Sequence, residues 1–176
     1  MNARSISGRA VKGVLILLAA GCAATPMVDD RVSADLTSYT MVQVLVEPDA
    51  MVRGAHGYDI TAAELARQFI DNVRAGGKAA VPGPGFAEGT VLEAKLTIRS
   101  LSYVSGAGRG AVGIGAGRAV LAVTMTLTDK QTGAQLGAAN AEHSSSHGQG
   151  VFSPTTARQI TAIAKELASR VTKKQP

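Results

Sequence analysis

One glycine-rich stretch of this 176-residue chain has a spacing that could bind phosphate. Residues 106–120 read GAGRGAVGIGAGRAV, and Gly108, Gly110 and Gly113 within them spell G-x-G-x-x-G. In a dinucleotide-binding loop, such glycines let the backbone approach a pyrophosphate, and the helix after them supplies N–H groups and the positive end of its dipole. The same composition is also compatible with a membrane segment or with a connection between two strands.

The residues that follow the glycines favour the third interpretation. Residues 119–128 alternate with a period of two, which predicts a strand and leaves no helix start to hold a phosphate. The P-loop motif is excluded because Arg118 follows the last glycine, where that motif needs a lysine. Arg118 also lies midway through the apolar window 110–128, and an arginine at a bilayer centre costs about 2.5 to 3.5 kcal/mol.

We therefore interpret the glycines as the connection between two antiparallel strands, where they permit positive φ and a close approach of backbones. No nucleotide and no other cofactor is expected at this loop. The residues that form a candidate interaction surface on it are Arg109, Gly113, Gly115, Gly117 and Arg118.

Two histidines have the spacing at which a helix could present them to a metal ion. His143 and His147 are four residues apart, but they lie in a Ser- and Gly-rich segment after a predicted strand. A third ligand would have to come from elsewhere, such as His56 or Glu142. The neighbouring serines lack the G-x-S-x-G turn of a hydrolase and a carboxylate to orient the imidazole. We expect no catalytic residue and no metal site, and hence a protein that is not an enzyme.

The N-terminus has the parts of an export signal. Arg4, Arg9 and Lys12 precede an apolar run over residues 14–20, and this run is shorter than the roughly 20 residues that span a bilayer. Small residues and Cys22, which is the only cysteine, come next. One cysteine cannot form an internal disulfide in an exported chain. We interpret Cys22 as a lipid attachment site rather than a reactive thiol.

The segment LLAAGC, which ends at Cys22, resembles the lipobox of bacterial lipoproteins, with Ala19 where that family usually has leucine. The resemblance implies cleavage before Cys22 and three acyl chains on this residue, and more than one acyl chain is needed for stable anchoring. Ala23 follows the cysteine where retained lipoproteins have aspartate. This implies sorting to the periplasmic face of the outer membrane, with the domain held there by lipid.

The charge of the mature chain argues against a nucleic-acid partner. Loss of residues 1–21 leaves 155 of the 176 residues and lowers Lys plus Arg from 18 to 15 against 13 Asp plus Glu, a net charge of +2. Nucleic-acid binding needs clustered positive charge, and single strands need aromatic stacking platforms. The chain has three Phe, three Tyr and no Trp.

The elements that must position these residues are those of one small α+β domain. Strands are predicted at 39–48, 91–98, 119–128 and 134–144, with helices from Thr61 to residue 75 and from Ser153 to residue 171. We expect an antiparallel sheet of about four strands, in the order β-α-β-β-β-α, with both helices packed on one face. The divisions are a signal peptide (1–21), a lipidated N-terminus and flexible tether (22–37), the domain (38–172) and a basic tail (173–176).

Local signals mark the ends of these elements. Thr61 and Glu64 have the spacing of a capping box at the first helix, and Ser153 and Pro154 read as N-cap and N1 of the second. A change of phase near Ser100 predicts a β-bulge. Residues 129–133, DKQTG, predict a turn, and residues 76–90 a loop without an element of its own.

Residues 102–136 are similar to a family of uncharacterised bacterial lipoproteins that is known only as a domain of unknown function. The similarity covers about residues 38–171 and implies a compartment and a fold, without a known activity. The matching pattern is GxGAG with a cation, an alternating strand, and D-x-x-T-G, carried by Gly113, Gly115, Gly117, Arg118, Asp129, Thr132 and Gly133.

Two hypotheses for the function follow. The first is a lipid-anchored cell-envelope protein that binds or scaffolds an envelope protein of unknown identity and has no enzymatic activity. The alternative is an oligomeric component of an outer-membrane secretion or assembly pore. In that alternative, strands 91–104 and 118–129 would pair with copies of themselves across the membrane. The sequence leaves the oligomeric state open.

Overall fold

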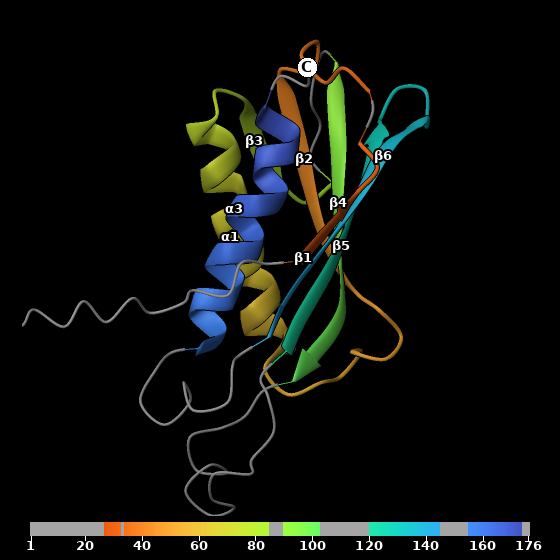
Figure 1. Cartoon of the computed structure of the whole chain (residues 1–176). Helices are drawn as coiled ribbons and strands as arrows, with labels where there is room; N and C mark the ends of the chain where they lie inside the picture. Colours follow the sequence, from red (N-terminus) through yellow and green to blue (C-terminus); the bar gives the residue numbers. More distant parts are fainter. Residues whose placement is uncertain (1–26, 33, 85–89, 103–119, 145–154, 174–176) are drawn as a thin grey trace, which may run out of the picture.

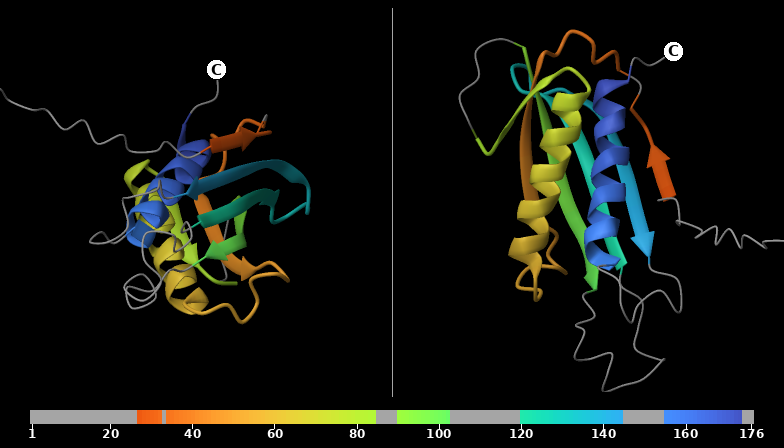
Figure 2. Two further views of the ribbon diagram at one scale, coloured as in Figure 1. Left: turned by 60° about the horizontal axis from the view of Figure 1, so that its bottom comes forward. Right: turned by 90° about the vertical axis from the view of Figure 1, so that its left-hand side faces the viewer.

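The computed structural model describes residues 27–32, 34–84, 90–102, 120–144 and 155–173. Six strands form one sheet, and two helices lie side by side on one of its faces (Figure 1, Figure 2). In chain order the elements are β1 (Met27–Asp30), β2 (Met41–Pro48), α1 (Tyr58–Ala75), β3 (Ala79–Pro82), β4 (Val91–Ser102), β5 (Val120–Asp129), β6 (Gln135–Ser144) and α3 (Thr155–Thr172). The predicted α+β class is confirmed, and so is the order of the main elements, to which β1 and β3 are additions.

The sheet is mixed, whereas the sequence led us to expect an antiparallel one. Its strand order is β1-β6-β5-β4-β2-β3, and the pairs β1–β6, β6–β5 and β5–β4 are antiparallel. Strand β2 is parallel to both β3 and β4. The reason is that α1 crosses the sheet face after β2 and returns the chain at the starting end, which makes the next strand parallel.

Two short strands at the edges of the sheet correct the sequence-based boundaries. Residues 76–90 were expected to hold no element, yet Ala79–Pro82 pairs with Met41–Val44 as β3. The tether was expected to reach residue 37, yet Met27–Asp30 pairs with β6, and Val32 and Leu36 are buried in the core. Each strand has four residues, too few for a local pattern, and is held by a longer neighbour.

The core lies between the helices and one face of the sheet. Strand β4 supplies Leu92, Ala94, Leu96 and Ile98, all with 0% exposure, and its alternation with polar residues is the predicted period of two. The predicted bulge is confirmed as a register shift between Ile98 and Ser100 in the β4–β5 pair. The apolar face predicted for α3 is buried, with Ile160, Ile163, Ala164, Leu167 and Val171 in the core.

The first helix starts earlier than its expected capping box. Gly57, at φ 78°, is the N-cap of α1 without a side-chain cap, and the Thr61 N–H donates to the Gly57 carbonyl at 3.0 Å. Thr61 is therefore inside the first turn and 3% exposed, so the capping-box prediction is wrong. The residues predicted to start α3, Ser153 and Pro154, lie outside the described part.

The two helices are parallel to each other and start at the same end of the molecule (Figure 2). Contacts at both ends agree with this. Gly57 and Ala157 line one pocket at the start of the helices, and a Cβ added at Gly76 would lie 2.4 Å from the Thr172 side chain at their finish. The N-terminal turns of α1 and α3 are thus neighbours.

Candidate binding surface

The glycine-rich connection joins two strands that the sequence identified. Strands β4 and β5 are antiparallel neighbours up to the pair Ser102–Val120, so residues 103–119 connect antiparallel strands, and a strand follows them as predicted. The candidate interaction residues of this loop lie outside the described residues, as does the lipidation site, and they stay predictions: Arg109, Gly113, Gly115, Gly117, Arg118 and Cys22.

The D-x-x-T-G residues build a tight turn between β5 and β6. The Asp129 Oδ1 atom accepts the N–H groups of Gln131 and Thr132, each at 2.8 Å. The Gly133 N–H donates to the Asp129 carbonyl at 2.8 Å, and Gly133 has φ 71°, a conformation that favours glycine. The predicted turn is confirmed, and its aspartate stabilises it through these hydrogen bonds.

The second carboxylate oxygen of Asp129 ties this turn to the chain before β2. The Tyr39 hydroxyl, on a residue only 7% exposed, donates to Asp129 Oδ2 at 2.6 Å. This hydrogen bond and burial raise the pKa of Tyr39 to about 12. The same hydrogen bond, followed by the Thr132 N–H, lowers the pKa of Asp129. The charged turn is thus fixed to the rest of the sheet.

The histidines do not converge in the described part of the chain. His143 lies on β6 opposite Leu121, and its neighbour Glu142 is exposed and points to the other face of the strand. The His143 Nδ1 atom is buried without a hydrogen bond to any described group. Within the described ranges, no three His, Cys, Asp or Glu side chains come close enough to share a metal ion, and His147 lies outside them.

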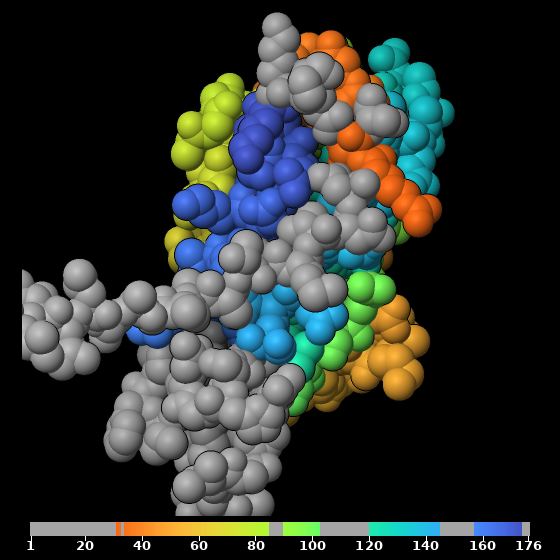
Figure 3. Space-filling model, viewed as in Figure 1, coloured from red at the N-terminus to blue at the C-terminus, as the bar shows by residue number. Residues whose placement is uncertain are grey.

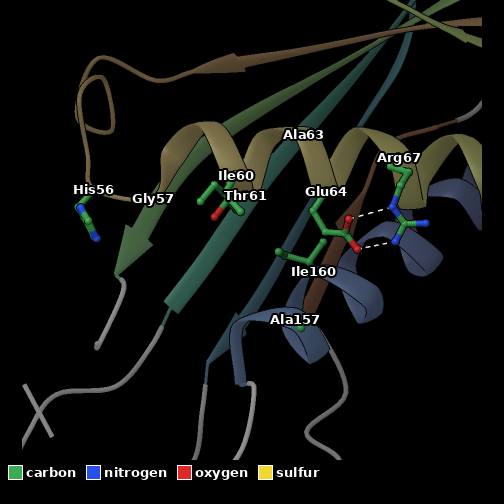
Figure 4. Close-up of a pocket in the computed structure, with 9 residues that line it drawn as sticks. All are labelled: His56, Gly57, Ile60, Thr61, Ala63, Glu64, Arg67, Ala157 and Ile160. Carbon is green, nitrogen blue, oxygen red and sulfur yellow. Dashed lines mark hydrogen bonds and ion pairs between the residues drawn. The ribbon is translucent and has the colours of Figure 1, made fainter. Parts of the chain in front are cut away.

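An apolar pocket, which the sequence did not reveal, opens between the N-terminal turns of α1 and α3 (Figure 4). Its volume is about 710 Å³, and its described walls include Ile60 and Ala63 from α1 and Ala157 and Ile160 from α3. The two alanines leave space between the helices that larger side chains would fill. This volume is within the roughly 300–1,000 Å³ typical of binding pockets.

Charged side chains form a fixed rim along the α1 side of the pocket. Arg67 binds Glu64 through Nε at 2.9 Å and Nη2 at 2.5 Å (Figure 4). It also binds Asp71 through Nη1 at 3.0 Å. The Gln68 amide donates to Glu64 as well, at 2.6 Å. The hydrogen bonds from Arg67 and then Gln68 lower the pKa of Glu64 to about 2. The rim stays charged at neutral pH.

One sequence signal for this pocket existed. The buried stripe of α1 consists of Thr61, Leu65, Phe69, Ile70 and Val73. Ile60 falls off this stripe, on the face that carries Glu64 and Arg67, and is 80% exposed. An isoleucine on the charged face of an amphipathic helix indicates a contact beyond the core. The part of the pocket that α3 forms could not be predicted from the sequence, because it depends on how the two helices pack.

Known structures share the fold. PelC from Paraburkholderia phytofirmans, described as a dodecamer, matches with TM-score 0.60 and 15% identity over 86% of this chain and 100% of that chain. A second crystal form of the PelC dodecamer matches with TM-score 0.57 and 14% identity over 86% and 99%. Protein XCC0632 from Xanthomonas campestris, assigned to the family DUF330, matches with TM-score 0.50 and 13% identity over 80% and 88%.

Sequence comparison adds no family assignment. No protein-family profile matches the chain, and no curated protein matches it either. At these low identities the structural matches define the fold that the chain shares. Within the described residues, neither helix is long and apolar enough to cross a membrane.

Proposed function

We propose that this chain is a lipid-anchored protein of the bacterial cell envelope, held on the periplasmic face of the outer membrane, which serves as a non-enzymatic subunit of an assembly of its own copies. The observation that carries the proposal is the likeness to a dodecameric protein over 86% of this chain and the whole of that one. The lipobox-like LLAAGC segment supports the anchor.

The assembly uses surfaces other than the strands we first considered. Strand β4 is hydrogen-bonded to β2 and β5, and β5 to β4 and β6. Within the described residues, β5 has a partner strand on both sides, and β4 has one on both sides over Leu92–Ile98. These segments have no free edge to offer to a copy, which argues against the pairing considered for strands 91–104 and 118–129. The oligomeric alternative stands, with side-chain surfaces in place of strand edges.

The position of β1 shortens the tether of the proposed anchor. Strand β1 begins at Met27, five residues after Cys22. At about 3.4 Å per extended residue, the lipidated cysteine reaches roughly 17 Å from the sheet. The domain would therefore lie against the membrane surface with the β1–β6 edge towards it, which restricts how neighbouring copies are oriented.

The anchor is tested by changing the cysteine. We expect Cys22→Ser to abolish labelling with radioactive palmitate and to leave the protein soluble or uncleaved, because the acyl chains have lost their attachment site. Ala23→Asp is the matched control: it should keep the label but move the protein to the inner-membrane fraction. A labelled Cys22→Ser protein, or one still found with the outer membrane, would refute the anchor.

The assembly is tested separately by sedimentation velocity of the full-length protein in mild detergent. The proposal predicts a species several times heavier than one chain at micromolar concentration. A monomer at every concentration would refute the assembly and leave the anchor unaffected.

A further inference from the structure

Two large apolar side chains are strongly exposed in the described part of the chain. Met51 is 88% exposed and Ile60 is 80% exposed. A single exposed apolar residue is ordinary, but one of these two lines the apolar pocket between α1 and α3. The other lies in the segment that connects β2 to α1. Both belong to the same end of the molecule, where the helices start.

The turn that carries Met51 is fixed to the sheet. The Asp49 N–H donates to the Ile98 carbonyl of β4 at 2.9 Å, and the Met51 N–H donates to Asp49 Oδ1 at 3.1 Å. The next residue, Val52, is 3% exposed and belongs to the core. With Val52 in the core and backbone hydrogen bonds on both sides of it, the backbone of the turn holds Met51 at the surface. Such preorganisation lowers the entropic cost of a contact.

The segment that carries Met51 leads from the sheet to the pocket, which its last residues, His56 and Gly57, line (Figure 4). The outer arc of residues 49–57 extends past the sheet on the side away from the helices, as Figure 1 and the left view of Figure 2 agree. The orange-gold atoms of this segment stand out at the lower right of Figure 3. The pocket opens between the N-terminal turns of α1 and α3, the helices that cover the other face of the sheet (Figure 1, Figure 4). Met51 is 88% exposed and is not among the residues that line the pocket of its own chain, so both are open to a second copy.

We propose that Met51 of one copy inserts into the pocket between α1 and α3 of the next copy. This inference rests on the proposed assembly and names its contact. The apolar walls of Ile60, Ala63 and Ile160 match a methionine, whose flexible thioether adapts to irregular space. The volume of about 710 Å³ admits the side chain together with part of its turn.

Charge at the edge of the contact is complementary. Glu64 and Arg67 line the pocket on the α1 side, and Asp71, one turn further along α1, forms a second ion pair with Arg67. The entering turn carries the exposed Arg53, two residues after Met51, and Asp49, whose Oδ1 atom already accepts the Met51 N–H. An arginine that arrives beside two acids and one base gains a net attraction, and such rim charges favour the correct orientation of approach.

A contact between two different surfaces propagates from copy to copy. Each subunit would use its Met51 turn towards one neighbour and its pocket towards the other, so that the interface is head-to-tail. Head-to-tail interfaces produce a closed ring when the rotation between neighbours closes, and an open filament when it does not. An interface in which the same patch met itself would stop at two copies.

The test uses two variants of the full-length protein that each damage one side of the contact. Met51→Asp removes the inserting side chain, and Ala63→Arg blocks the pocket. Both positions are exposed, so each variant should remain folded, with the circular dichroism spectrum of the wild type. Each change should weaken one contact by more than about 30-fold, as for a central interface residue, and reduce the assembly to monomer in sedimentation velocity.

Matched variants control for the added charge and for the loss of methionine. Ala75→Arg places the same charge at an exposed position of α1 far along the helix from the pocket, and it should keep the wild-type mass. Met51→Leu keeps an apolar side chain of similar size and should also assemble.

Mixing the two damaged variants identifies the geometry. A Met51→Asp subunit retains its pocket, and an Ala63→Arg subunit retains its methionine, so an equimolar mixture should form dimers and nothing larger. A mixture that stays monomeric would overturn the head-to-tail contact. If both variants keep the wild-type mass while the wild type assembles, the contact is wrong but the assembly stands, and the pocket takes another occupant. If the wild type is a monomer, both are wrong.

Discussion

At the scale of single residues, Asp129 shows how one carboxylate organises an end of this sheet. One oxygen accepts two backbone N–H groups within its own turn, and the other accepts the Tyr39 hydroxyl from 90 positions earlier in the chain. The D-x-x-T-G pattern is thereby explained by the turn that it forms and by the hydrogen bond that attaches this turn to Tyr39. Its residues have partners inside the fold.

We predict that Tyr39→Phe lowers the free energy of unfolding at pH 7 by about 1 kcal/mol, because one buried hydrogen bond is lost. The substitution should also change how the free energy of unfolding depends on pH in the alkaline range. The pKa of Tyr39 is about 12 in the folded state against 10.0 for a free tyrosine, so the unfolded state loses its proton first. The stabilisation that the Tyr39 hydrogen bond gives to the folded state is complete below pH 10 and disappears as the pH rises to 12.

Urea unfolding at pH 7 and pH 11 measures both effects. The difference between wild type and Tyr39→Phe should be smaller at pH 11 than at pH 7. Asp129→Asn serves as the companion variant. It should lower the free energy of unfolding more than Tyr39→Phe does, because it weakens both the turn and the hydrogen bond to Tyr39. An equal difference at the two pH values would contradict the role assigned to this hydrogen bond.

At the scale of elements, the edge of the sheet depends on a close approach at Gly137. A Cβ at this position would lie 2.8 Å from the Cα of Val32 and 3.0 Å from its Cγ2. The chain after β1 crosses β6 here, where the Arg31 N–H donates to the Ala138 carbonyl at 2.9 Å. Only glycine leaves room for that crossing.

We predict that Gly137→Ala destabilises the domain by about 1–3 kcal/mol, the usual cost of overpacking. The nearest atom is backbone, so adding Val32→Ala should not restore stability. Hydrogen exchange should show that protection is lost mainly at β1 and the adjoining edge of β6. Recovery of stability in the double variant would mean that the valine side chain, rather than the backbone, sets the limit.

The sequence predicted the elements whose own residues carry a full pattern. Leu92 to Ile98 alternate because one face of β4 is buried, and Leu65, Phe69 and Val73 recur because one face of α1 is. The edge strands β1 and β3 have no such pattern, because their hydrogen bonds come from β6 and β2. The parallel direction of β2 and β4 is likewise a property of the crossover and is invisible in either strand.

The candidate site escaped prediction for a related reason. Its walls come from Ile60 and Ala63 on one helix and Ala157 and Ile160 on another, nearly 100 positions later. Each pair looks like ordinary helical sequence. The pocket exists because the two helices are parallel and start together, and no local spacing encodes that arrangement.

At the scale of the whole molecule, the proposed assembly would use two different surfaces of each chain. One is the pocket between α1 and α3, and the other is the exposed Met51 in the segment between β2 and α1. The proposed anchor at Cys22 holds every copy at a similar distance from the membrane, about 17 Å at most from β1. Copies confined to one surface and joined head-to-tail are expected to close into a ring parallel to it.

The number of chains in the assembly tests this account most directly. Native mass spectrometry of the full-length protein, released from mild detergent at several concentrations, should yield one closed stoichiometry above two copies, with the lipid mass on every chain. The same number at each concentration is the result that a closed ring predicts. Monomers throughout would contradict the assembly itself, and a ladder of masses that lengthens with concentration would contradict its closure.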